Sequence, residues 1–152
     1  MLRDVAQSAT RPGFAMDLRV WVLQGSTEEA RALGEDTVTR SRRRLGADHF
    51  LTLFACAMLA LANARDGDAE QGCALGEDTM QRARNSLGPD HLFTLAAAAA
   101  VSISLARLGA MGHAHTLGAD TVARARNRLG PDHPFTRLLT QVLAAAPPLA
   151  GT

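Results

Sequence analysis

The sequence predicts an all-α fold, a solenoid in which antiparallel helix pairs stack one on another. A five-residue phrase, Leu-Gly-x-Asp-His, occurs at 45–49, 87–91 and 129–133, in steps of 42 residues, and an internal period of this length is typical of solenoids. Each period holds two segments with helical spacing of apolar residues. Alanine is abundant and aromatic residues make up only 4% of the chain, which favours close-packed helices over strands.

Two further landmarks keep the same step. A Leu-Gly-x-Asp-Thr sequence starts at positions 33, 75 and 117, and a glycine stands at positions 25, 67 and 109. In the middle unit we expect a first helix over 50–64 and a second over 69–87. Gly67 would form the turn between them, because glycine readily adopts the positive φ of a tight link. Gly88 would cap the end of the second helix.

A third set of glycines, Gly34, Gly76 and Gly118, lies inside the second helices. Each costs about 1 kcal/mol relative to alanine at a helical position. Their recurrence at one register predicts a close helix–helix approach that a Cβ atom would obstruct.

The period predicts one solenoid domain over residues 10–146, with about three and a half units, about seven helices, and short tails over 1–9 and 147–152. A more polar first helix over 10–23 suits the end of a stack, and its second helix is expected over 28–45. The last unit has only a first helix, over 135–146. An apolar flank would be left open there, and two chains could cover it in a symmetric homodimer.

Composition disfavours several partners. The net charge is only +1, whereas a domain that binds nucleic acid usually has a clear basic excess. The longest apolar run, Leu95 to Ile103, is too short to span a bilayer. Cys56 and Cys73 are the only cysteines, and we expect both to be buried free thiols in a reducing compartment. We therefore expect a cytoplasmic protein without a nucleic-acid or membrane partner.

The repeated phrase supplies His49, His91 and His133 at fixed spacing. Equivalent positions two helix layers apart are separated by roughly 20 Å, so these side chains cannot share a metal ion at about 2 Å. We expect the aspartates to cap free N–H groups at helix starts and the histidines to serve capping and turn formation. The pair His113 and His115 diverges on a helix. No metal, cofactor or catalytic group is expected.

Arginines recur on the second helices. Arg40, Arg82 and Arg124 each follow an aspartate by four residues, the favourable helical order, worth about 0.2–0.5 kcal/mol per pair. This pairing favours a solvated charged face over a stripe that binds RNA or an acidic partner.

Together these residues resemble a known family. The pattern L-G-x-D-H-x-x-T-L, a small-residue helix, a glycine turn, A-x-x-L-G-E-D-T and R-x-R is similar to the tetratricopeptide repeat of the kinesin light chain type, and to bacterial arrays of that type, over about residues 25–140. The resemblance implies a right-handed superhelix whose first helices line a concave groove, and a non-catalytic adaptor that binds a peptide or protein. The asparagine pairs with which the family often holds a peptide backbone are replaced here by Ala57-Met58 and Ala99-Ala100.

On this resemblance, the groove would be a smooth apolar trough that holds an apolar or amphipathic helical segment, with Arg65 and Arg107 contacting an acidic flank. Three alternatives stand beside it: the trough residues are packed core, the chain is a self-associating scaffold, or it is a ligand-binding or enzymatic helical protein. The expected groove residues are Phe54, Ala57, Leu61, Arg65, Ala96, Ala99, Ile103, Arg107, Leu138 and Gln141.

Overall fold

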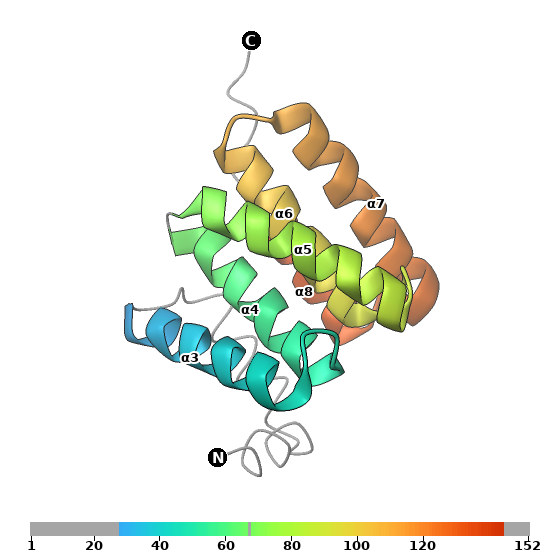
Figure 1. The fold of residues 1–152 in the computed structure, drawn as a ribbon. Helices are drawn as coiled ribbons and strands as arrows, with labels where there is room; N and C mark the ends of the chain where they lie inside the picture. Colours follow the sequence, from blue (N-terminus) through green and yellow to red (C-terminus); the bar gives the residue numbers. More distant parts are fainter. Residues whose placement is uncertain (1–27, 67, 145–152) are drawn as a thin grey trace.

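The computed structural model describes residues 28–66 and 68–144, which form six α-helices and no strand. The helices are α3 (Glu28–Leu45), α4 (Phe50–Asp66), α5 (Ala69–Leu87), α6 (Leu92–Arg107), α7 (Met111–Leu129) and α8 (Pro134–Ala144) (Figure 1). The all-α prediction is confirmed, and the helices predicted over 28–45 and 69–87 have those bounds. The helix expected over 10–23 lies outside the described residues, as do Gly25 and Gly67.

Two helices differ slightly from their predicted bounds. The helix expected over 50–64 continues to Asp66. Its last turn is supported from α6, because Arg107 Nη1 donates to the carbonyl oxygens of Ala64 and Arg65. Helix α8 begins at Pro134, one residue earlier than expected, since proline is favoured in the first turn, where its missing N–H has no helical acceptor.

The helices form two layers, one of first helices and one of second helices, and helices that follow each other in the sequence run antiparallel (Figure 1). Helices α4, α6 and α8 pack on one another in succession, α5 lies across α4 and α6, and α7 lies across α6 and α8 (Figure 1). Helix α3 packs on α4. This is the predicted α-solenoid, in which the first helix of each unit packs on the first helix of the next.

Helix α6 is the centre of the core. Every residue from Thr94 to Ser104 is buried, and its five consecutive alanines belong to a helix enclosed by α4, α5, α7 and α8. Its small side chains allow close packing from several directions. Because neighbouring helices enclose it on all these sides, the helix has no polar face.

The predicted close approach at the internal glycines is confirmed. A Cβ atom at Gly76 would lie 2.8 Å from Val101 Cγ2, one at Gly118 would lie 2.9 Å from Ser102 Oγ, and one at Gly34 would lie 3.1 Å from Leu59 Cδ1. The absence of a side chain at these positions therefore allows each second helix to pack closely against a neighbouring first helix.

Candidate functional site

The histidines of the repeated phrase cap the first helices. The Nδ1 atoms of His49, His91 and His133 accept hydrogen bonds from the backbone N–H two residues further on, at 3.3, 3.2 and 3.2 Å. Only a neutral imidazole can accept at Nδ1. Burial, together with the charge of Arg128, lowers the pKa of His91 below its ordinary 6.5, which favours the capping form. The predicted capping role of the histidines is confirmed.

Two aspartates of the phrase, Asp48 and Asp90, do something else, so the predicted capping role is wrong for these two; for Asp132 it stays a prediction. Asp48 accepts a hydrogen bond from Arg82 Nη1 at 3.1 Å, and Asp90 accepts one from Arg124 Nη1 at 2.9 Å. The histidine already occupies the capping position, which leaves the preceding carboxylate free to turn toward the second helix of its own unit.

Each of these arginines also holds the aspartate four residues before it. Arg82 lies 3.1 Å from Asp78, and Arg124 lies 2.8 Å from Asp120, as the helical spacing predicts. We call this arrangement of one guanidinium between two carboxylates the arginine clamp. The hydrogen bonds to both carboxylates raise the pKa of each arginine. Each clamp places one positive charge between two negative charges and fastens the start of the first helix to the second.

The residues expected to form the trough are mostly interior. Leu61, Ala96, Ile103 and Leu138 are buried members of the main core cluster, and Phe54 is partly buried against it. These five come together along the first helices, as expected, but their own packing covers most of their surface. Their role in binding stays a prediction.

One predicted row points into the interior of the stack. Ala57 and Ala99 have no exposed surface at all. Gln141, one period after Ala99, is exposed on α8, where no further helix of the described part covers it. The row therefore faces the interior wherever a neighbouring helix is present, and it does not line a groove.

The two trough arginines lie at the far end of the first helices. Arg65 is half-buried. Arg107 is exposed, yet its Nη1 donates to the last carbonyl oxygens of α4. This contact compensates carbonyl groups that a helix end leaves unpaired. The expected contact of these arginines with an acidic flank stays a prediction.

Sequence reasoning missed the row next to these residues. A narrow apolar cleft lies between α4 and α8, above Ala96, with a void of about 20 Å³, room for roughly one water molecule or methyl group. Its lining includes Met58, Phe135 and Val142, which no prediction named. Met58 and Val142 are two periods apart, so the signal was present in the repeat. The complete lining is Met58, Leu61, Ala96, Phe135, Leu138, Leu139 and Val142.

Apolar side chains reach the surface where the first helices begin. Phe50 is 48% exposed and Leu92 is 36% exposed, and they hold equivalent positions on the adjacent helices α4 and α6. Just behind them the Phe54 and Phe93 rings meet across the two helices, with centroids 5.0 Å apart. A continuous apolar surface therefore runs from exposed side chains at the helix starts into the core.

The outer face of α8 carries both polar and apolar side chains. Pro134, Arg137, Gln141 and Ala144 are exposed and follow one helical stripe, while Leu138, Leu139 and Val142 are buried on the other side. The expectation of an open apolar flank on this helix, covered in a homodimer, stays a prediction. At the two polar positions of the stripe, Arg137 and Gln141, helix α6 has Leu95 and Ala99.

The cysteines are both free. Cys56 is buried, and this burial raises the pKa of its thiol despite the nearby Arg42. Cys73 is only half-buried, so the expectation of burial is confirmed for Cys56 alone. Burial and the charge of Glu77 raise the pKa of the Cys73 thiol. Raised pKa values disfavour the thiolate, the reactive form.

Within residues 28–66 and 68–144, no group of three or more His, Cys, Asp or Glu side chains is placed to hold a metal ion. No helix in the same part of the chain has the length and apolar character needed to cross a membrane.

The family assignment follows from the repeat. A family model described as tetratricopeptide repeat matches residues 19–51 and 94–135. The second stretch has the length of one complete 42-residue repeat. The chain is a tetratricopeptide repeat protein. Between the two matched stretches, this tetratricopeptide repeat protein carries the same landmarks and the same helix pair over α4 and α5. Its assignment to the kinesin light chain type and to bacterial arrays stays a prediction.

A comparison with curated proteins finds no match, and a comparison with solved structures finds none either. Tetratricopeptide repeats generally mediate protein–protein interaction and are typically not enzymes. The surface of this tetratricopeptide repeat protein that is relevant to function is therefore the one that meets a protein partner.

Proposed function

We propose that this protein is a non-catalytic adaptor that binds an apolar or amphipathic segment of a protein partner along the first helices of its units. The observation that carries the proposal is the exposure of Phe50 and Leu92 at equivalent positions of adjacent helices. They continue inward into the Phe54–Phe93 contact and the cleft beside Ala96.

The energetics support a surface of this kind. Complete burial of a phenylalanine or leucine side chain contributes about 1.5–3 kcal/mol, and both side chains retain much of that surface. Adjacent packed helices lie about 8–10 Å apart, close to the roughly 10.5 Å between residues seven apart on a helix. One face of an amphipathic helix could therefore contact both positions.

The cleft itself has a smaller part in this proposal. Its void of about 20 Å³ accommodates at most one small side-chain group. A partner helix would rest against the exposed helix starts and insert no more than a methyl-sized group beside Ala96. The trough residues then support the binding surface from behind.

The test compares two leucines at opposite ends of α6. Leu92 stands at its start and Leu108 directly follows its end, at 36% and 47% exposure. Leu92→Ser should abolish or strongly weaken capture of specific proteins from the source lysate, while Leu108→Ser should retain them. Both substitutions affect exposed side chains, so both variants should unfold at nearly the wild-type urea concentration.

A second experiment measures direct contact between this surface and the captured proteins. A photo-cross-linking amino acid at position 50 should form covalent adducts with the same captured proteins, and the adducts should disappear in the Leu92→Ser background. If folded Leu92→Ser protein captures the same partners in the same amounts, this surface is not where the protein acts.

A further inference from the structure

The loops before the first helices form a basic edge. We define the loop edge as residues 42–50, 84–92 and 126–134, each of which ends at the first residue of α4, α6 or α8. These segments contain six arginines and three aspartates, a net charge of +3, although the whole chain carries only +1. The positive charge is therefore concentrated beside Phe50 and Leu92.

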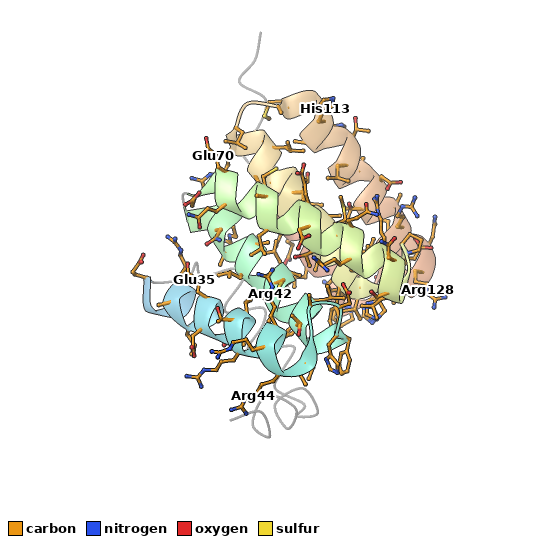
Figure 2. The ribbon with its side chains drawn as sticks, viewed as in Figure 1. Glu35, Arg42, Arg44, Glu70, His113 and Arg128 are labelled. Atoms are coloured by element: carbon orange, nitrogen blue, oxygen red, sulfur yellow. The ribbon has the colours of Figure 1, made fainter. Side chains whose placement is uncertain are left out.

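The charges of the loop edge differ in availability. Asp48 and Asp90 are held in the arginine clamps. All six arginines of the edge are exposed, and none of them forms a salt bridge with a carboxylate of the described residues. Arg42 is held by a contact with Cys56 Sγ, which leaves five. Figure 2 shows two of them, Arg44 and Arg128, at the outer margin of the molecule, at the ends of α3 and α7. The five are Arg43, Arg44, Arg84, Arg126 and Arg128.

Arg128 lies on α7 one turn after Arg124, whose Nη1 donates to Asp90 at 2.9 Å, two residues before Leu92. The charge of Arg128 acts on His91, the residue that caps α6 immediately before Leu92. The equivalent position in the middle unit is Ser86, which is also exposed. The unit that presents Leu92 therefore has an arginine where the unit that presents Phe50 has a short neutral side chain.

From this arrangement we infer that the loop edge binds an acidic partner segment, one in which carboxylates flank large apolar residues. Phe50 and Leu92 contact the apolar residues, and Arg128 pairs with a carboxylate beside them. The inference rests on the proposed function, because the same apolar side chains take part, and it adds the chemical class of the partner.

Charge complementarity gives the exposed arginines of this edge a role in binding. Long-range attraction between a basic edge and an acidic segment speeds encounter and suppresses partners of the wrong charge. Exposed charges are screened by salt over about 10 Å at 0.1 M ionic strength. Binding at this edge should therefore weaken as the salt concentration rises, whereas purely apolar binding should not.

The experiment uses a random peptide library displayed on phage and selected against the immobilised full-length protein. Recovered peptides should be enriched in both Asp or Glu and large apolar residues. Binding of a recovered peptide is then measured by fluorescence anisotropy. Arg128→Glu should weaken it by about two- to fivefold, the range that exposed charge pairs support.

A gain-of-function variant provides the stronger test. Ser86→Arg places a second arginine at the register of Arg128, beside Phe50, and should tighten binding of the acidic peptide and steepen its dependence on salt. Ser86→Asp is the matched control and should weaken binding. Neither substitution alters a buried side chain.

The outcomes separate the inference from the proposed function. If recovered peptides are apolar without acidic enrichment, and Leu92→Ser abolishes their binding, the acidic inference is overturned and the proposed function stands. If recovered peptides bind Leu92→Ser and wild type equally, the proposed function is overturned. Failure to recover any peptide counts against both.

Discussion

Replacing Gly72 by alanine should destabilise the fold, although alanine is the better helix former. A Cβ atom at Gly72 would lie 2.7 Å from the backbone nitrogen of Ala64 and 2.8 Å from Ser104 Oγ. The backbone of α4 cannot rotate away as a side chain can, so α4 and α5 must separate. Overpacking costs about 1–3 kcal/mol, and a backbone contact belongs at the upper end. Alanine restores about 1 kcal/mol of helix propensity, which leaves a net loss of about 2 kcal/mol.

Two other glycines calibrate this estimate. A Cβ atom at Gly76 would meet Val101 Cγ2 at 2.8 Å, a stiff β-branched side chain, so Gly76→Ala should lose about 1 kcal/mol after the propensity gain. Removing the opposing methyl groups with Val101→Ala should make the two substitutions couple favourably. A Cβ atom at Gly112 would meet nothing within 4 Å, so Gly112→Ala should gain up to about 1 kcal/mol.

Urea unfolding followed by far-ultraviolet circular dichroism measures all of these variants, with the slope checked for two-state behaviour. The expected order of stability is Gly112→Ala, wild type, Gly76→Ala, then Gly72→Ala. Equal free energies of unfolding for Gly72→Ala and Gly112→Ala would refute the close approach of α4 and α5.

Two further predictions concern helix ends. Folding lowers the pKa of His91. The contribution of this histidine to stability is therefore complete above pH 6.5 and is lost as the pH falls through the folded-state pKa. His91→Asn, which caps without titrating, should reduce this acid sensitivity in urea titrations at neutral and mildly acidic pH. Arg107→Ala removes the donor to the last carbonyl oxygens of α4 and should cost about 1 kcal/mol in thermal or urea unfolding, whereas an unchanged midpoint would show that the contact contributes nothing.

Local patterns predicted much of this fold because local physics determines those features. The bounds of α3 and α5 follow from caps, glycines and apolar spacing within each helix. The pairs formed by Arg82 and Arg124 with the aspartates four residues earlier follow from helix geometry alone. In contrast, the contact between Asp48 and Arg82 joins residues 34 apart. It depends on how two helices pack, which spacing within one helix does not specify.

The trough was harder to predict for a related reason. The centre of α6 has alanine at five consecutive positions, so the sequence does not distinguish one face of this helix from another. Periodicity therefore cannot identify which face lines the cleft and which face packs inside the stack. Only the last helix carries the distinction, because Gln141 marks the row that faces the next layer and Val142 marks the row that faces the cleft. Comparing the equivalent positions of each row would have added Met58 and Val142 to the predicted residues that line the cleft, Leu61, Ala96 and Leu138.

The repeats also show which positions of the loop edge the fold leaves free. Asp48, Asp90 and the histidines that follow them are identical because clamps and caps require those groups. The next residue varies between phenylalanine, leucine and proline, and it is exposed in all three units. The register of Ser86 and Arg128 varies as well. If packing alone determined these positions, a polar residue at each helix start would suffice. Exposed apolar side chains, beside an arginine that forms no salt bridge with a carboxylate of the described residues, are better explained by recognition of a partner.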